Sequence, residues 1–443
     1  MRKKKNAFTL IELLAVIAIL AIILVISIPK ILDVIETSKI NTLKNTVKLI
    51  ADSAEKKYTE NEAFGEEEEI TCESVSKLNK EDYNKCTIIF DENGIAKVSI
   101  LGRGKFKGLK VIEATKTSAE VIKLEAPKYG ITAVEYINEL YEYDSDTNNL
   151  KIDNTSDENM RYYGSNPNNY VSFNNELWRI IGVFKDNVKL IRNEKLGYLS
   201  WDTSESTINN GNGINQWGES TYEDGTTYEG SDLMQYLNKM YYGGDTTVTC
   251  YNSFNNVTTT CPKNSKGNFL TIDGTSKSLI DNHTWNIGAV ETTKKADTLA
   301  FYNAERGITI GKTCTVSSSD YKCNDTVTRT TEWTGYVGLP YVTDWAYASS
   351  ESTCETDMYV RDSSNSYACK NNNWMHWSSW LWYMSPSTLS AHFSWAIYVV
   401  GYNNSSYTAG GYSVKPSIYL KSNVLIESGA GTSNNPYILK LGE

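Results

Sequence analysis

The chain has 443 residues and a formal net charge of −10 at pH 7, with 43 basic residues against 53 acidic residues. This length is sufficient for two or three domains, one of them large. The acidic balance argues against a nucleic acid partner for the bulk of the chain, because phosphate binding depends on an excess of clustered Lys and Arg.

The N-terminus is a short basic leader followed by a long apolar segment. The leader holds Arg2 and three lysines, and the segment 8–28 has Thr9, Glu12 and Ser27 as its only polar side chains. At a rise of about 1.5 Å per residue, this segment is long enough to cross a bilayer as one helix. The basic leader is expected to stay on the cytoplasmic side.

The order of basic leader, small residue and Phe-Thr-Leu-Ile-Glu resembles the prepilin signal of type IV pilins and type II secretion pseudopilins. The resemblance implies that a prepilin peptidase cuts between Ala7 and Phe8 and that the new amino terminus of Phe8 is N-methylated. It identifies Glu12 as the family's characteristic carboxylate and Pro29 as its helix-kinking proline. The implied partners are other pilin subunits, the peptidase and the membrane.

A carboxylate inside a membrane segment is costly, by about 2.5–3.5 kcal/mol on insertion scales, and such a group usually has a partner. After cleavage, the nearest candidate partner of Glu12 is the α-amino group of Phe8, on the same chain or on a neighbouring subunit. Assembly would then neutralise both charges. The alternative is a single-pass anchor in which Glu12 lies at the membrane interface.

Residues 29–124 are predicted to form a pilin-like head. Apolar residues recur at helical spacing beyond Pro29, so we expect one amphipathic helix to about Tyr58, with its apolar stripe on Leu43, Val47, Ile50 and Ala54. Short strands are expected to follow at 87–90, 95–101, 109–114 and 118–124, in a small antiparallel sheet.

Two further segments complete the predicted domain organisation. Residues 125–160 are rich in Asp, Asn, Glu and Ser and are interpreted as a linker. Every tryptophan lies after this segment, so residues 161–443 are expected to form a second, extracellular domain. A hairpin is predicted there at 178–184 and 187–193, with a short helix at 233–237.

The second domain has sequence features of its own. Trp-Arg-Ile-Ile, Trp-Leu-Trp-Tyr-Met-Ser-Pro, Val-Val-Gly and Lys-Pro-Ser-Ile-Tyr-Leu resemble a module fused to prepilin signals in Gram-positive bacteria. A more distant likeness is to C-type-lectin-like or formylglycine-generating-enzyme-like folds. It implies only a fold. The resulting fold class is α+β: a long pilin helix with a small antiparallel sheet, then a large, mostly β, disulfide-stapled domain.

Eight cysteines fall into four local couples, which suggests local disulfides in an oxidising compartment. Zinc is the alternative, but none of the couples has a typical zinc-ligand spacing and the chain has three histidines. We therefore expect no metal site and no cofactor. The candidate disulfides are Cys72 with Cys86, Cys250 with Cys261, Cys314 with Cys323, and Cys354 with Cys369.

A dense group of late aromatic residues is the candidate ligand-binding surface. Such side chains form either a buried core or an exposed platform that stacks on sugars or anchors a protein partner. The core interpretation is favoured, and binding through Trp374 and Trp377 is the alternative. The group consists of Trp374, Trp377, Trp380, Trp382, Tyr383 and Trp395.

The sequence contains no His-Glu-x-x-His and no Gly-x-Ser-x-Gly motif. Gly-Lys-Thr at 311–313 lacks the earlier glycine that a nucleotide-binding loop requires. We therefore do not expect an enzyme. The leading hypothesis is a type IV pilin-like subunit, in a minor or tip position, that is inserted in the membrane and then displays a binding domain at the cell surface. The alternatives are a pseudopilin of a type II secretion or DNA-uptake apparatus and a filament-anchored extracellular enzyme.

Overall fold

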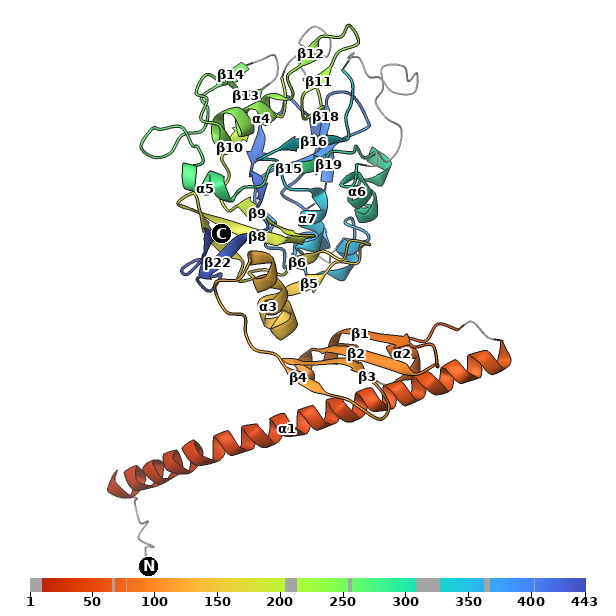
Figure 1. The fold of residues 1–443 in the computed structure, drawn as a ribbon. Helices are drawn as coiled ribbons and strands as arrows, with labels where there is room; N and C mark the ends of the chain where they lie inside the picture. Colours follow the sequence, from red (N-terminus) through yellow and green to blue (C-terminus); the bar gives the residue numbers. More distant parts are fainter. Residues whose placement is uncertain are drawn as a thin grey trace, which may run out of the picture. The chain divides into compact units, whose positions relative to one another are not determined.

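The computed structural model describes residues 10–65, 68–76, 78–203, 213–253, 257–307, 327–361, 367–401 and 403–443. The chain divides into two compact units. Unit 1 comprises residues 1–126 and 142–146, and unit 2 comprises residues 127–141 and 147–443. As the sequence predicts, the protein is α+β, with a long N-terminal helix and then a mostly β unit (Figure 1).

Unit 1 is built on α1 (Leu10–Phe64), whose C-terminal half packs on a four-stranded antiparallel sheet. The strands follow one another in the order β1-β2-β3-β4, as a meander. Their bounds are β1 (Tyr83–Phe90), β2 (Ala96–Gly102), β3 (Leu109–Ala114) and β4 (Val121–Lys123). The connections contain the short helices α2 (Cys72–Val75), η1 (Lys80–Asp82) and η2 (Gly104–Phe106).

The β1–β2 hairpin turns at Asp91 to Gly94. The carboxylate of Asp91 accepts hydrogen bonds from the backbone N–H groups of Asn93 (2.9 Å) and Ile95 (3.0 Å), which is how Asp stabilises a turn. Gly94 has a φ of 72°, and a Cβ there would lie 3.0 Å from the ring of Tyr58 on α1. Glycine therefore allows both the turn and its close approach to the helix.

The long helix extends beyond its expected end near Tyr58 to Phe64. Tyr58 stacks on Phe90 at 4.7 Å between ring centroids, and the next inward position is taken by Asn61, which is 8% exposed. Its Nδ2 atom donates to the carbonyl oxygen of Glu68 at 2.8 Å. A search for apolar periodicity misses this last turn because a polar residue continues the stripe.

Pro29 does not interrupt α1, which is assigned as one continuous helix across it. The apolar stripe of the second half lies where the sequence predicts, since Leu43, Val47, Ile50 and Ala54 are all buried to 1% exposure or less. These residues face β2 and β3 and form the core of unit 1.

Unit 2 contains a large, mainly antiparallel sheet in the order β21-β9-β8-β7-β23-β22, with β6 paired to β8 and β5 to β6. The pairing of β23 with β7 is parallel. The bounds are β5 (Leu150–Ile152), β6 (Met160–Tyr162), β7 (Tyr170–Phe173), β8 (Glu176–Phe184), β9 (Asn187–Arg192), β21 (Ser417–Tyr419), β22 (Val424–Ser428) and β23 (Tyr437–Leu441).

A second sheet of unit 2 has the order β10-β20-β17-β18-β19. Its strands are β10 (Gly197–Leu199), β17 (Leu381–Pro386), β18 (Phe393–Ile397), β19 (Asn403–Tyr407) and β20 (Tyr412–Val414). Three two-stranded ladders pair β11 (Ser220–Thr221) with β12 (Thr227–Tyr228), β13 (Cys250–Ser253) with β14 (Val257–Thr259), and β15 (His283–Asn286) with β16 (Glu332–Gly335).

Short helices connect these strands. They are α4 (Asp232–Gln235), η3 (Tyr236–Tyr242), α5 (Gly274–Leu279), η4 (Thr292–Lys294), α6 (Thr298–Ala304), α7 (Val342–Tyr347), η5 (Ser352–Glu355) and η6 (Ala368–Lys370). The expected short helix at 233–237 lies in α4 and the π-helical η3. The expected hairpin is β8 with β9, and its turn residue Lys185 has a φ of 53°.

The segment 125–160 differs from the expected linker. It contains α3 (Ala133–Asn148) and β5, and unit 2 begins at Pro127. Tyr136, Ile137 and Leu140 of α3 are buried in the core of unit 2. The few apolar residues of this polar stretch share one face of a helix, which the composition of the whole segment conceals.

Seven tryptophans are fully buried in the core of unit 2, in agreement with the predicted concentration of aromatic residues there. Trp201 lies edge to face with Trp217 at 4.8 Å and with Trp382 at 6.0 Å between ring centroids. Edge-to-face pairs of this kind add to the stabilisation from burial alone. The fully buried tryptophans are Trp178, Trp201, Trp217, Trp285, Trp345, Trp382 and Trp395.

Candidate functional site

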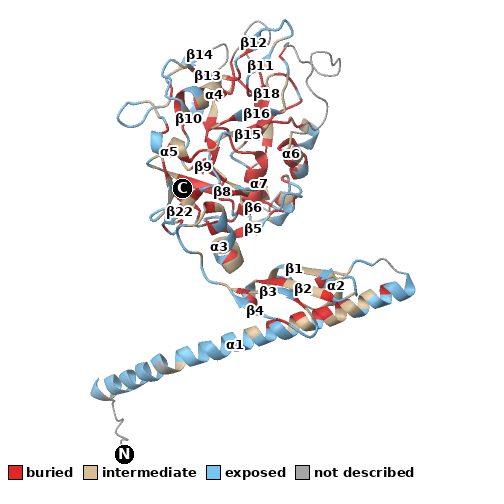
Figure 2. Ribbon diagram, viewed as in Figure 1, coloured by how far each residue is buried: buried red, intermediate tan, exposed pale blue. Residues whose placement is uncertain are grey.

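The first half of α1 is an apolar surface that no other described part of unit 1 covers. We call residues 10–35 the exposed half of α1. The exposed fraction of its large apolar side chains runs from 46% at Ile35 to 79% at Ile11 (Figure 2). These side chains are Leu10, Ile11, Leu13, Leu14, Val16, Ile17, Ile19, Leu20, Ile22, Ile23, Leu24, Val25, Ile28, Ile31, Leu32, Val34 and Ile35.

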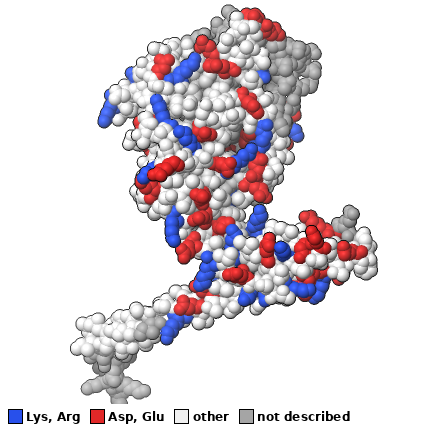
Figure 3. Space-filling model, in the orientation of Figure 1, with Lys and Arg blue, Asp and Glu red and all other residues white. Residues whose placement is uncertain are grey.

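The exposed half of α1 also lacks charge over most of its length. The sequence has no Lys, Arg, Asp or Glu from Leu13 to Pro29, and Figure 3 shows this stretch in white. α1 is the one helix among the described residues that is long and apolar enough to cross a membrane. A helix that is apolar on all sides is stable in a bilayer or among other helices, and is unfavourable in water.

Charged residues appear where the exposed half ends and the packed half begins. Glu36 forms an ion pair with Lys123 of β4 at 2.7 Å, and both side chains are largely exposed. Further along, Lys48 donates to the carbonyl oxygen of Thr117 at 2.9 Å. Glu55 accepts from Lys116 at 2.6 Å and from the N–H of Ala96 at 3.3 Å. Polar contacts beside the buried stripe thus join α1 to β2, to β4 and to the connection between β3 and β4.

The predicted processing residues Ala7 and Phe8 lie outside the described residues. Glu12 lies in α1, two residues after Leu10, where the described part of the helix begins. The structure does not describe the side chain of Glu12. The proposed pairing of Glu12 with the Phe8 amino group therefore stays a prediction. Pro29 lies in the exposed half of α1, between the stretch without charges and the first charged residues.

Most of the candidate ligand-binding aromatics lie in the core of unit 2. Trp382, Tyr383 and Trp395 are 0% exposed and Trp374 is 5% exposed. The indole N–H groups of Trp374, Trp382 and Trp395 donate to the carbonyl oxygens of Tyr162, Leu199 and Val290 at 2.8–3.1 Å. These four side chains have no face free to stack on a ligand, so the platform hypothesis is wrong for them.

Trp377 and Trp380 are the two candidates that reach the surface, since both are half-buried. Trp380 packs against Tyr398 at 3.5 Å and Tyr412 at 4.8 Å between ring centroids. The ammonium of Lys415 lies 3.9 Å from the ring centroid of Trp377. Burial lowers the pKa of Lys415 to about 7. The structure therefore places a buried amine, charged only below about pH 7, over the ring of Trp377.

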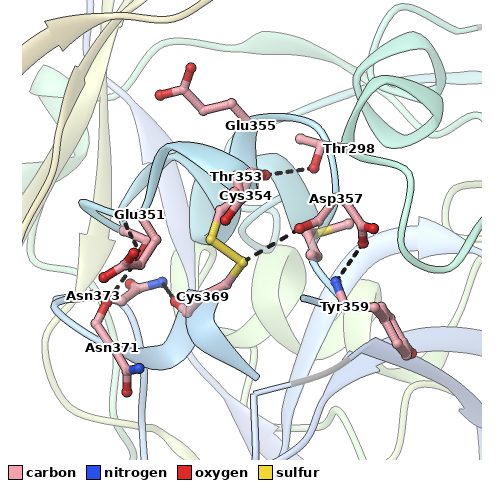
Figure 4. Close-up of a disulfide and its surroundings, with 12 residues drawn as sticks. Thr298, Glu351, Thr353, Cys354, Glu355, Asp357, Tyr359, Cys369, Asn371 and Asn373 are labelled. Carbon is pink, nitrogen blue, oxygen red and sulfur yellow. Dashed lines mark hydrogen bonds between the residues drawn. A yellow bond between two sulfur atoms is a disulfide. The ribbon is translucent and has the colours of Figure 1, made fainter. Parts of the chain in front are cut away.

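Three of the four predicted cysteine couples are disulfides: Cys72 with Cys86, Cys250 with Cys261, and Cys354 with Cys369. Cys314 and Cys323 lie outside the described residues, as does the Gly-Lys-Thr segment. Figure 4 shows the Cys354–Cys369 bridge, whose ends are held by hydrogen bonds. Thr298 donates to the carbonyl oxygen of Cys354 at 2.7 Å, and Asn373 donates to that of Cys369 at 2.8 Å.

Unit 2 also contains a buried cluster of charged residues that the sequence analysis missed. Arg161 donates to Asp153 at 2.9 Å and to Asp344 at 2.8 Å, and Lys189 donates to Asp344 at 2.6 Å. Glu305 accepts from the N–H and hydroxyl groups of Thr343. The sequence did contain one signal for this cluster, the lysine inside the apolar run Val-Lys-Leu-Ile of β9. A lysine at a buried position of a strand requires a charged or polar partner from elsewhere in the fold.

Burial is the main influence on this cluster, which we call the Lys189 cluster. It raises the pKa of Glu305 to about 7, and the nearby charge of Asp344 acts in the same direction. Burial lowers the pKa of Lys189, and Asp344 opposes that shift. Among the described residues, no group of histidines, cysteines and carboxylates is arranged to hold a metal ion.

Comparison with known proteins gives one match, at the N-terminus. Residues 2–28 match the family model of the prokaryotic N-terminal methylation motif. No curated protein and no solved structure matches the chain. The match covers the leader and most of the exposed half of α1. The motif and the apolar helix together support a type IV pilin-like or pseudopilin-like protein.

Proposed function

We propose that this chain is a type IV pilin-like filament subunit, in a minor or tip position, that carries an extracellular binding domain. One observation carries the proposal: the methylation motif at residues 2–28 overlaps a helix, described from Leu10, whose first half is apolar and uncovered within unit 1. The second half of the same helix is buried against a folded head. One helix thus offers an assembly surface and a fixed connection to the head.

The proposed mechanism has three steps. The exposed half of α1 inserts into the membrane with the basic leader on the cytoplasmic side. A prepilin peptidase then cuts between Ala7 and Phe8, and the new amino terminus is methylated. Finally, the exposed half leaves the lipid for a bundle of equivalent helices, where Glu12 pairs with the amino group of Phe8 of the same or a neighbouring subunit.

The minor or tip position is proposed on the basis of size. Unit 2 continues for about 300 residues beyond α3, which every copy in a filament would have to accommodate outside the helical bundle. A subunit present in few copies avoids this crowding. The alternative, supported by the same N-terminal motif, is a pseudopilin of a secretion or DNA-uptake apparatus whose large unit engages cargo.

Unit 2 is proposed to act by binding and not by catalysis. The half-buried Trp377 and Trp380 support this assignment, because aromatic side chains at a surface stack on sugar rings or anchor protein partners. The disulfides of unit 2 support display outside the cell, because disulfides form in oxidising compartments. The resemblance of its sequence motifs to a Gram-positive module supports a Gram-positive host. The ligand class proposed is an extracellular glycan or protein.

The test of the assembly step is Glu12→Ala, with Glu36→Ala as the matched control. Glu36 is also a carboxylate on α1, but its partner Lys123 is at the surface of unit 1. We expect Glu12→Ala to insert and be cleaved normally, while its amount in purified filaments falls about tenfold or more, since an unmatched amino group in an apolar bundle costs more than about 1.4 kcal/mol. Glu36→Ala should assemble normally.

The readout is the ratio of chain in sheared filaments to chain in membranes, with amino-terminal sequencing to detect Phe8. Normal incorporation of the Glu12→Ala variant into filaments would contradict the proposed pairing of Glu12 with the amino group of Phe8. Absence of the wild-type chain from filaments, together with its presence in a secretion complex, would favour the pseudopilin alternative.

A further inference from the structure

The Lys189 cluster contains an amine and a carboxylate in direct contact inside the core of unit 2. Nζ of Lys189 lies 2.6 Å from Oδ2 of Asp344, and both side chains have no exposed area. Lys189 is on β9 and Asp344 is in the first turn of α7, 155 residues further along the chain. The fold therefore brings two complementary reactive groups together from distant parts of the sequence.

Aromatic rings surround the amine of Lys189. Its Nζ lies 3.9 Å from the ring centroid of Tyr341, and between 5.3 and 5.5 Å from those of Tyr419, Trp285 and Phe184. Trp285 is fully buried, and Tyr341 and Tyr419 are 6% and 4% exposed. This enclosure removes the water that would otherwise solvate the ion pair and oppose its condensation.

The carboxyl group of Asp344 is held by different donors on its two oxygens. Nη1 of Arg161 donates to Oδ1 at 2.8 Å. The backbone N–H of Tyr341 donates to Oδ2 at 2.8 Å, beside the ammonium of Lys189. The carbon between the oxygens is thus fixed next to the amine, with a guanidinium on the oxygen that faces away from it.

We propose that Lys189 and Asp344 condense to form an intramolecular isopeptide bond, so that unit 2 carries a covalent amide between β9 and α7. The Nζ–Cγ bond forms and the Cγ–Oδ2 bond breaks. Nζ gives up two protons and Oδ2 accepts both, so the step releases one water molecule. The reaction is a condensation without any change of oxidation state, and it requires no co-reactant.

Each surrounding group has a role in this step. Arg161 stabilises the negative charge that develops on Oδ1 when the amine attacks, as an oxyanion hole does. The fixed approach of Nζ to the carboxyl group supplies the proximity that makes an intramolecular reaction fast. Burial lowers the pKa of Lys189, which favours the neutral amine, and it raises the pKa of Glu305 to about 7, so that this carboxyl is partly protonated near neutral pH.

Other Lys–carboxylate pairs of the protein provide an internal contrast. Lys151 contacts Glu355 at 2.7 Å, but the two side chains are 20% and 19% exposed. Lys56 contacts Asp52 at 2.7 Å on the surface of α1. The distance between the lysine nitrogen and the carboxylate oxygen does not distinguish these two pairs from Lys189 and Asp344. The complete burial of Lys189 and Asp344 does, as does the hydrogen bond from Arg161 to the other oxygen of Asp344. We therefore expect the amide at one pair and free side chains at the other two.

The test is the mass of the full-length chain, purified in the folded state and then denatured. The wild-type protein should be lighter than its sequence and disulfides require by the mass of one water molecule. Proteolysis should release one branched peptide that joins the segments containing Lys189 and Asp344, while peptides containing Lys151 and Glu355 stay separate. This measurement does not depend on filament assembly, so its failure would leave the proposed function unaffected.

Variants of the two partners give the controls. Lys189→Arg should restore the full mass, because a guanidinium does not form the amide. Asp344→Asn should form the same bond with loss of ammonia in place of water, which a purely ionic contact would not do. A folded wild-type chain with the full mass, and with no branched peptide, would overturn the proposal even if both variants failed to fold.

Discussion

The exposed half of α1 and the core of unit 2 are both rich in large apolar side chains, but they differ in what covers them. In α1, the large apolar side chains described between Leu10 and Ile35 are at least 46% exposed. In unit 2, tryptophans such as Trp382 and Trp395 are fully buried, and their indole N–H groups are bonded to backbone carbonyl oxygens. Apolar composition therefore does not identify a binding surface, whereas uncovered apolar area does.

The strongest test of this comparison is Trp382→Ala. Because Trp382 is fully buried between other aromatic rings, its removal should lower the free energy of unfolding of unit 2 by about 3–5 kcal/mol. Denaturant unfolding of the detergent-solubilised chain, followed by near-ultraviolet circular dichroism, measures the change. A stable Trp382→Ala protein that had lost only ligand binding would reverse the assignment of this residue to the core.

The boundary between the two kinds of surface runs through α1, and a pair of leucines locates it. Leu43→Ala should lower the free energy of unfolding of unit 1 by about 2–5 kcal/mol, because Leu43 is 0% exposed. Leu20→Ala should change it by less than about 0.5 kcal/mol, because Leu20 is 52% exposed. Proteolysis of the solubilised chain at increasing denaturant measures both. Equal effects would show that the exposed half is covered within the subunit.

The last test concerns the buried amine of Lys415, which lies beside the half-buried Trp377. The pKa of Lys415 falls from 10.5 to about 7 in the folded state, so between these values the unfolded chain binds more protons. The stability of unit 2 should therefore gain a positive contribution from this group as the pH rises from about 7 to about 10. Lys415→Met should flatten that part of the stability profile. An unchanged slope would mean that the lysine is solvated.

The sequence predicted the elements that depend on a single strong periodicity. The stripe from Leu43 to Ala54 predicted which face of α1 is buried, and the alternation around Lys185 predicted the β8–β9 hairpin. The last turn of α1 was missed because Asn61 continues the apolar stripe with a polar side chain. The segment at α3 was interpreted as a linker because its few apolar residues are diluted by acidic ones.

The aromatic residues of β17 show why the candidate ligand site was only half predictable. The sequence left a buried core and an exposed platform open for these residues, and in the structure β17 lies between β20 and β18 in its sheet, with all its residues buried. A central strand covered on both faces has no alternation to read. The Lys189 cluster was missed for a related reason, since its members come from β6, β9, α7, the end of α6 and the residue that follows β5, and only the fold brings them together.

The parallel pairing of β23 with β7 constrains when unit 2 can finish folding. β7 begins at Tyr170, but its partner begins at Tyr437, a few residues from the last one in the chain. During synthesis, the edge of β7 must wait for almost the entire unit to emerge. The two disulfides described in unit 2 have no such delay, since their cysteines are separated by 11 and 15 residues. These disulfide loops can thus close before the main sheet is complete, which makes the C-terminal strand the element on which a truncated chain would fail.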